Sequence, residues 1–226
     1  MIDVAISEQV ASACPFLKVA VISCEVTNSD TSEALWQEIA DFETIFRGTF
    51  HIEDINKRKA IQATRAAYKK LGKDPNRYRP SAESLCRRIL KGLALYKINT
   101  LVDLINLVSL KTGYSIGGFD EEKIDGKELL LGVGEAGEVF HGIGRGILNI
   151  EGLPVYRDRQ GGIGTPTSDE ERTKIAISTK RLFMIINGYS GKDGLEDAVT
   201  YSVELLEKYV KAANLEIRYI STPNQK

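Results

Sequence analysis

The sequence has few of the residues on which metal sites and catalytic triads are built. Its 226 residues include 2 His, 3 Cys and 1 Trp. Cys14, Cys24 and Cys86 are widely spaced and form no CxxC or Cys/His ligand pattern, which argues against a disulfide framework or a bound metal. A triad would need His51 or His141, and no G-x-S-x-G motif accompanies either one. We therefore expect structural or surface roles for both histidines.

The chain also lacks an excess of charge and a long apolar run. Its 30 basic and 31 acidic residues give a net charge of -1, so a strongly basic arm or tail that binds DNA is not expected, and any polyanion site must be a local patch. No stretch approaches the ~18 consecutive apolar residues of a membrane helix, and the first residues lack a basic signal-peptide region. These features predict a cytoplasmic globular protein that does not bind membranes.

Two glycine-rich segments fall short of nucleotide-binding motifs. The segment 141–148, HGIGRGIL, contains Gly142, Gly144 and Gly146, but this spacing lacks the third glycine of the dinucleotide fingerprint. The segment 188–192, GYSGK, is too short for a Walker motif. We therefore predict a β-turn at 141–148, no NTPase activity and no cofactor.

Hydrophobic periodicity predicts an α+β fold. The β-branched run 16–27 is typical of a strand buried on both faces near the middle of a sheet. Apolar spacing of three to four predicts helices at 32–47, 53–71, from Pro80–Ser81 onward, 99–112 and 193–210. Short β-rich runs occur at 129–133, 138–141, 147–150, 154–157, 174–178, 182–187 and 215–221. We expect a mixed central sheet with packed helices and a β-rich second half, in a single domain spanning 1–226.

The loop 161–173, GGIGTPTSDEERT, combines backbone freedom with hydroxyl groups, Asp169 and Arg172. Glycines allow a ligand to approach main-chain N–H groups closely, and hydroxyl groups can fix its orientation. The alternative is an ordinary turn whose serine and aspartate hydrogen-bond the local backbone. Both interpretations remain open from the sequence.

The densest basic cluster lies around the predicted start of the helix at Pro80–Ser81. Such a patch can neutralise several phosphates, and a tyrosine in it could stack on a base. The alternative is a solvated helix face whose cations pair with Glu83 or other carboxylates, and the sequence favours neither. The candidate nucleic-acid-binding residues are Arg77, Tyr78, Arg79, Arg87, Arg88 and Lys91.

Residues 103–120, DLINLVSLKTGYSIGGFD, resemble the signature of the tRNA-editing module of the phenylalanyl-tRNA synthetase β-subunit, formed by its third and fourth B-type modules. Further matches follow in the same order and place the similarity at about residues 60–190. They are Lys123, Ile124, Gly126, Gly137–Glu138, Gly161–Gly162, Ser168, Asp169 and Thr173. The segment 77–90, RYRPSAESLCRRIL, is typical of stand-alone relatives that carry no synthetase core.

The resemblance implies hydrolysis of the ester bond in tyrosine mistakenly attached to tRNA-Phe, by a water held in a polar pocket with help from tRNA hydroxyls. By position, Asn106 matches the family's pocket asparagine, Phe119 and Asp120 match its corner, and Gly161–Gly162 matches its glycine-rich wall. The candidate substrate-binding residues are Asn106, Gly117, Gly118, Phe119, Asp120, Gly161, Gly162, Thr165, Ser168, Asp169 and Thr179.

Three positions depart from the family pattern. Ile105 stands where the family has threonine, Gly117 where it has histidine, and Thr179 where it has the pocket glutamate. A site without polar partners cannot favour a hydroxylated side chain over phenylalanine. The resemblance therefore predicts the family and the fold more firmly than it predicts specificity for tyrosine.

Three functions follow as hypotheses, of which the third makes the chain purely an interaction partner of a synthetase or ribosome component. The first is a tRNA-binding protein of translation that hydrolyses mischarged aminoacyl-tRNA in trans. The second is a non-catalytic module that binds an amino-acid-like small molecule or the tRNA acceptor end. The sequence leaves open whether the chain is an enzyme, and it identifies no catalytic residue.

Overall fold

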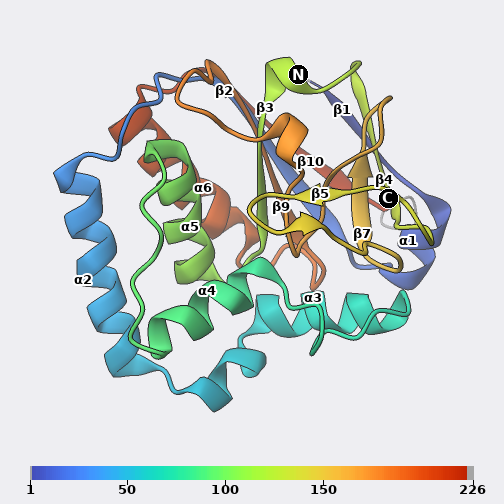
Figure 1. Cartoon of the computed structure of the whole chain (residues 1–226), viewed down its shortest axis with the longest axis horizontal. Coiled ribbons are helices and arrows are strands. Elements are labelled where there is room, and N and C mark those ends of the chain that lie inside the picture. The colour runs from blue at the N-terminus through green and yellow to red at the C-terminus, as the bar shows by residue number, and fades with distance from the viewer. Residues whose placement is uncertain (1, 223–226) are drawn as a thin grey trace.

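Two four-stranded sheets share an apolar core in the computed structural model, which describes residues 2–222 (Figure 1). The first sheet is antiparallel throughout, in the order β10 (Ala213–Ser221), β2 (Lys18–Glu25), β9 (Arg181–Gly188) and β3 (Ile116–Asp120). The second is mixed, in the order β1 (Asp3–Ile6), β4 (Glu128–Val133), β7 (Pro154–Arg157) and β8 (Gly162–Gly164), with β1 parallel to β4. A separate hairpin pairs β5 (His141–Gly142) with β6 (Gly146–Ile147).

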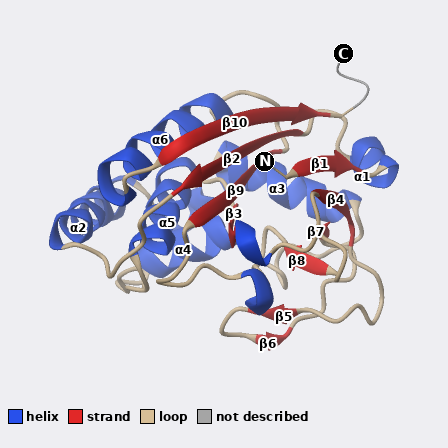
Figure 2. Ribbon diagram, turned by 90° about the horizontal axis from the view of Figure 1, so that it is seen from above, coloured by secondary structure: helices blue, strands red, loops and turns tan. Residues whose placement is uncertain are grey.

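The helices lie mainly on one face of the first sheet (Figure 2). The core on this face is built mainly by α2 (Glu33–Thr49), α4 (Ser81–Leu90), α5 (Thr100–Thr112) and α6 (Leu195–Val210), with Ala60 and Ile61 from the start of α3 (Lys59–Lys70). Elsewhere lie α1 (Glu8–Ala13), the rest of α3 and three short 3-10 helices at Ile52–Lys57, Glu121–Lys123 and Glu171–Thr173. None of the helices within residues 2–222 has both the length and the apolar character of a membrane span. The predicted α+β class, with its β-rich second half, is confirmed.

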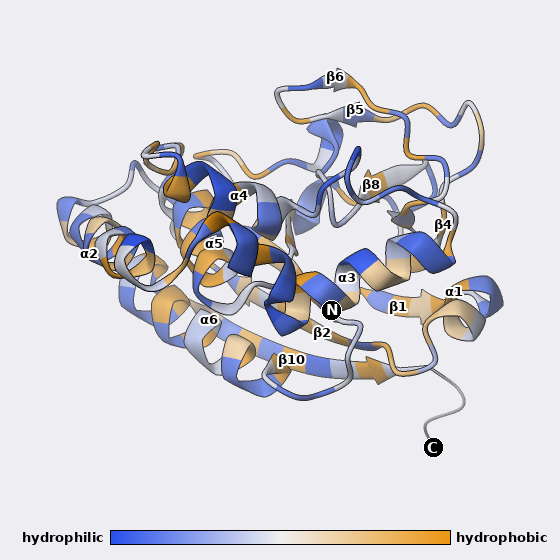
Figure 3. Cartoon of the chain, turned by 90° about the horizontal axis from the view of Figure 1, so that it is seen from below, coloured by the Kyte–Doolittle hydropathy of each residue, from blue (hydrophilic) through white to orange (hydrophobic). Residues whose placement is uncertain are grey.

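The alternation of side chains along β2 separates two cores. Ala20 and Ile22 face the helices, whereas Val19 and Val21 face the second sheet. Successive residues of a strand point to opposite faces, so a strand covered on both sides must be apolar at every position. This explains why the run beginning at Phe16 reads as a central strand, and Figure 3 shows hydrophobic positions along β2.

Helix α5 follows its prediction closely. The Asn99 side chain caps its start by accepting a hydrogen bond from Val102 N–H at 3.1 Å. Gly113 ends it in the left-handed conformation, with φ of 84°, which favours glycine because that residue has no Cβ. Nine of the thirteen residues between these caps are buried, so α5 forms the centre of the helical layer.

Four predicted elements differ in the structure. The strands expected at 138–141 and 147–150 are shortened to the two-residue strands β5 and β6. The helix expected at 53–71 divides at Arg58, whose backbone is extended and whose guanidinium donates to Leu110 O at 2.8 Å and Lys111 O at 2.7 Å. The predicted helix is therefore interrupted at the residue whose side chain caps the last carbonyl groups of α5. The strand expected at 174–178 is a turn with one isolated bridge from Lys174 to Phe119, because apolar residues such as Ile175 pack here without a ladder partner.

A buried carboxylate holds α3 and α4 together. Glu83 is fully buried and forms ion pairs at 2.8 Å with both Arg65 of α3 and Arg87 of α4. Arg79 approaches the same carboxylate at 3.9 Å. A buried charge is tolerated only when it is paired, so these contacts fix the orientation of the arginines.

We predict that Glu83→Gln lowers the free energy of unfolding by ~3–5 kcal/mol, because it leaves two enclosed guanidinium groups without their counter-charge. Urea denaturation followed by circular dichroism measures the effect. The exposed Glu204→Gln on α6 is the control and should change stability by less than ~0.5 kcal/mol. Equal stabilities of the two variants would contradict this account of Glu83.

Candidate functional site

A pocket of about 350 Å³ lies between α5, β3 and the segment that follows β8. One part of its wall is aliphatic, and the other part carries polar side chains. The lining residues are Ser81, Leu85, Ile98, Val102, Ile105, Asn106, Ser109, Ile116, Gly118, Ile143, Thr165, Ser168, Asp169, Lys174 and Ile175. We call this cavity the apolar pocket. It brings together Asn106, Gly118, Thr165, Ser168 and Asp169 from the predicted set.

Gly118 lets α5 approach β3 closely. A Cβ at this position would lie 2.7 Å from Ile105 Cδ1 and 3.0 Å from Ile175 Cδ1, closer than such atoms pack in proteins. The side chains of Ile105 and Ile175 therefore pack against the backbone of β3 at Gly118. The neighbouring Asn106 is partly exposed and contributes an amide to the wall.

The Asp169 carboxyl lies against glycines of two strands. Gly118 N–H donates to its Oδ2 at 3.1 Å. A Cβ at Gly164 would lie 2.9 Å from its Oδ1, and one at Gly117 would lie 3.5 Å away. Within residues 2–222 no lysine or arginine forms an ion pair with this carboxyl. Burial raises the pKa of Asp169 to about 7, and the hydrogen bond from Gly118 opposes part of that rise.

The hydroxyl groups of the 165–168 turn hydrogen-bond mainly within the turn. Thr165 Oγ1 accepts from the N–H groups of Thr167 and Ser168 and donates to Ser168 O at 3.0 Å. Ser168 Oγ donates to Asp169 O at 3.2 Å. This is the local turn pattern weighed as the alternative for the loop. It leaves Asp169 and Asn106 as the polar side chains best placed to meet a ligand.

A second cavity of about 360 Å³, the basic groove, adjoins the apolar pocket. The two share Ser81, Leu85 and Asn106 as lining residues. Cations line the groove from two elements far apart in sequence: Arg79, Arg87, Arg88 and Lys91 around α4, and Arg145 in the β5–β6 turn.

The groove cations differ in how far other contacts engage them. Arg87 pairs with Glu83, and Arg88 donates to Ala94 O at 2.6 Å and lies 3.8 Å from the centre of the Tyr96 ring. Lys91 and Arg145 are exposed. Both interpretations of the basic cluster therefore apply, to different members of it. Arg87 is a paired structural cation, whereas Lys91 has no ion-pair partner among residues 2–222 and can meet an anion.

Arg77 and Tyr78 lie outside the groove lining. Tyr78 packs against a small core beneath α3, and Lys73 Nζ lies 3.8 Å from the centre of its ring. This cation–π contact occupies a face of the ring that a base would need for stacking. Arg77 is exposed beside it.

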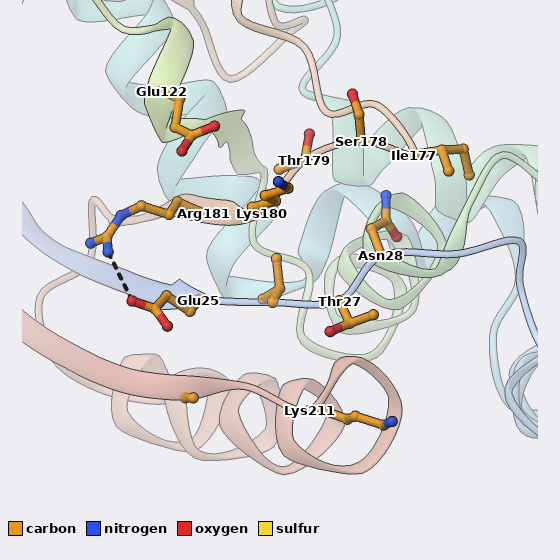
Figure 4. A pocket seen from close by; sticks show the side chains of 12 residues that line it. Glu25, Thr27, Asn28, Glu122, Ile177, Ser178, Thr179, Lys180, Arg181 and Lys211 are labelled. Atoms are coloured by element: carbon orange, nitrogen blue, oxygen red, sulfur yellow. Dashed lines mark hydrogen bonds and ion pairs between the residues drawn. The ribbon is translucent and has the colours of Figure 1, made fainter.

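The structure places Phe119, Asp120 and Thr179 outside the apolar pocket. Phe119 is buried in the core between the two sheets. Thr179 Oγ1 donates to Asp120 Oδ2 at 2.9 Å, and Lys123 Nζ lies 3.3 Å from the same oxygen. Thr179 instead lines a shallow polar cavity of about 630 Å³ at the ends of β2 and β9 (Figure 4). Arg181 and Glu25 pair at 3.4 Å in this cavity.

Gly161 and Gly162 also lie apart from both the pocket and the groove. Gly161 completes a turn organised by Asp158, whose carboxylate Arg172 binds at 2.8 and 2.9 Å. A Cβ at Gly162 would lie 3.0 Å from the Phe140 ring. These glycines make room for core packing and for a tight turn.

The structure adds pocket and groove residues that sequence reasoning did not select. Ile98 precedes α5, Ile143 and Arg145 belong to the predicted turn, and Lys174 follows the 161–173 loop. The sequence feature that could have pointed to Arg145 is its position between two glycines in segment 141–148. Within residues 2–222, no three His, Cys, Asp or Glu side chains lie close enough together to bind a metal ion.

A solved structure resembles this chain. A crystal structure of an N-terminal fragment of the phenylalanyl-tRNA synthetase β-subunit from Pyrococcus horikoshii is similar, at 15% sequence identity and a TM-score of 0.49. The similarity covers 96% of this chain and 50% of that one, so the chain spans half the length of that structure. A comparison with curated proteins gave no match.

The fold and the two adjoining cavities define an α+β protein with a ligand-sized pocket beside a basic groove. The family model described as the B3/4 domain matches residues 63–215, more than half of the chain. The chain therefore belongs to the B3/4 domain family. The predicted resemblance to the third and fourth B-type modules of the phenylalanyl-tRNA synthetase β-subunit is confirmed.

We predict that Asp169 makes stability depend on pH. Its folded pKa lies above the unfolded value of about 3.9, so the folded protein binds more protons between these values and loses stability as the pH rises. In Asp169→Asn the amide oxygen still accepts from Gly118, but the titration is gone. The stability of the variant relative to wild type should therefore rise between about pH 4 and pH 7 and stay constant above. Denaturant titrations across this range test it, and a pH-independent difference would contradict it.

Proposed function

We propose that the chain binds the aminoacylated 3′ end of a tRNA and hydrolyses its ester bond. The aminoacyl group occupies the apolar pocket, and the RNA backbone follows the basic groove. The observation that carries this proposal is that the two cavities share Ser81, Leu85 and Asn106. An aminoacyl ester joins an apolar group directly to a polyanion, and the adjoining cavities match that combination.

Size and charge support the proposal. The pocket volume of about 350 Å³ falls at the lower end of small-molecule sites, which suits an amino-acid side chain better than a nucleotide. Exposed cations beside the pocket attract the phosphates of an RNA backbone and make RNA binding depend on salt. Membership of the B3/4 domain family supports a role connected with tRNA synthetases.

Asp169 is the proposed general base. A carboxyl with a pKa of about 7 is ionised in a large fraction of molecules near neutral pH and still holds a proton well. It would take a proton from water as the water oxygen attacks the ester carbonyl carbon. The C–O bond to the ribose then breaks, the ribose oxygen takes up a proton, and a free amino acid and uncharged tRNA are released. The Asn106 amide is placed to orient the aminoacyl group.

The second candidate is a non-catalytic module that binds an amino-acid-like ligand or the acceptor end. The observation in its favour is the small number of polar groups in the pocket: Ile105 replaces a polar family residue, and the Thr165 hydroxyl bonds within its own turn. This candidate predicts thermal stabilisation by the ligand without turnover.

We predict that purified protein deacylates misacylated tRNA and that Asp169→Asn slows the single-turnover rate by about 100-fold or more. The pocket's aliphatic wall should favour tRNA that carries phenylalanine or isoleucine over tRNA that carries tyrosine. Release of radiolabelled amino acid measures the rate, and tRNA in buffer is the control. Binding without release in wild type would favour the non-catalytic module. Absence of both would overturn the proposal.

We predict that Lys91→Glu weakens tRNA binding roughly tenfold at moderate salt. It should also reduce the slope of log Kd against log salt by about one, because one phosphate contact is lost. The exposed Lys69→Glu on α3 makes the same charge change outside both cavities and should leave binding unchanged. Arg87→Glu is a poor probe, since it would place a second carboxylate beside buried Glu83. Filter binding at several salt concentrations gives the result, and equal losses in both variants would contradict a groove-specific effect.

A further inference from the structure

The β5–β6 hairpin lies where the apolar pocket meets the basic groove. Ile143 in its turn lines the pocket, and Arg145, two residues later, lines the groove. Figure 2 shows the hairpin projecting away from the main sheets, beyond β8. One short turn therefore contributes an apolar side chain to one cavity and a cation to the other.

Glycines shape this turn so that both side chains are presented. Arg145 N–H donates to Gly142 O at 2.9 Å and closes the turn. Gly144 and Gly146 have φ of 66° and 70°, a region that side chains with a Cβ rarely occupy. The glycine spacing that failed as a nucleotide motif thus serves to position Ile143 and Arg145.

The hairpin is fastened to the segment that carries Asp169. Ile143 N–H donates to Asp169 O at 3.0 Å, and Gly144 N–H donates to Glu171 Oε1 at 3.2 Å. His141 Nδ1 lies 3.7 Å from Glu170 Oε1. These contacts fix the position of the turn beside the pocket.

Arg145 is also available for an external anion. It is exposed, and within residues 2–222 it forms no ion pair or side-chain hydrogen bond. Lys91, which follows the last residue of α4, is exposed in the same groove, while Arg87 and Arg88 are engaged by Glu83 and Tyr96. The free cations of the groove therefore come from two separate elements.

We propose that the tip of this hairpin is a two-part recognition element, in which Arg145 binds a backbone phosphate of the RNA 3′ end and Ile143 contacts the aminoacyl side chain. This inference rests on the proposed function and adds two residues to it. It requires no hydrolysis, since it concerns binding of both parts of one ligand. It also predicts that the two residues respond to different parts of that ligand.

The test compares Arg145→Glu and Ile143→Ala with wild type, using uncharged tRNA and tRNA that carries phenylalanine through a non-hydrolysable amide. Arg145→Glu should weaken binding of both RNAs roughly tenfold, because a phosphate contact is lost and a repulsive charge is added. Ile143→Ala should weaken binding of the aminoacylated RNA severalfold and leave the uncharged RNA unaffected, because only the pocket loses apolar contact.

Two controls match these changes. Lys69→Glu reverses an exposed charge outside the groove, and Ile147→Ala shortens a side chain that is 81% exposed on the same hairpin and lines neither cavity. Both should bind like wild type, and all four variants should unfold at similar temperatures. If wild type binds tRNA and Arg145→Glu binds no worse than Lys69→Glu, or Ile143→Ala affects both RNAs alike, the hairpin proposal is overturned while the proposed function stands. If wild type binds neither RNA, the proposed function fails with it.

Discussion

The hydrogen bond from Gly118 N–H to the Asp169 carboxyl joins the segment after β8 to strand β3, and the rest of the site is arranged around that junction. The carboxyl fits there because Gly164 carries no side chain: a Cβ at Gly164 would lie 2.9 Å from Asp169 Oδ1, and one at Gly117 would lie 3.5 Å away. Burial among these glycines raises the pKa of Asp169 towards neutrality. The same segment anchors the β5–β6 hairpin through Asp169 O. The close packing that requires glycine beside Asp169 is therefore also the cause of its raised pKa.

The basic groove illustrates how packing divides a cluster of like charges into separate roles. Glu83 neutralises and orients Arg65 and Arg87 inside the protein, which fixes α4 against α3. Lys91 and Arg145 remain exposed at the groove. Charges that are paired in the interior hold the wall in place, and charges that are exposed on it can attract an anion. Neither role follows from residue type alone.

Much of the fold was predictable because local rules and tertiary packing agree there. Helix α5 has an asparagine cap, an apolar interior and a terminal glycine, and β2 is apolar on both faces. The predictions were wrong where a distant contact prevailed, as at Arg58, which caps α5 instead of continuing its own helix. Of the candidate ligand residues, Asn106 and Asp169 meet in one pocket, while Thr179 pairs with Asp120 elsewhere. Spacing along the chain could not separate these cases, because it does not show which segments pack beside one another in the folded protein.

The sequence by itself determined the family, the α+β class and the stretch from Asn99 to Asp120, because caps, hydrophobic period and motif order are local properties of the chain. The tertiary structure decided which side chains share a cavity. It brought Ile143 and Arg145 from a distant turn to the edge of α4 and α5, and it left the partly buried Asp169 without an ion pair among residues 2–222. Proximity across long loops and the loss of solvent around a charge arise only when the elements pack, so no local pattern could contain them.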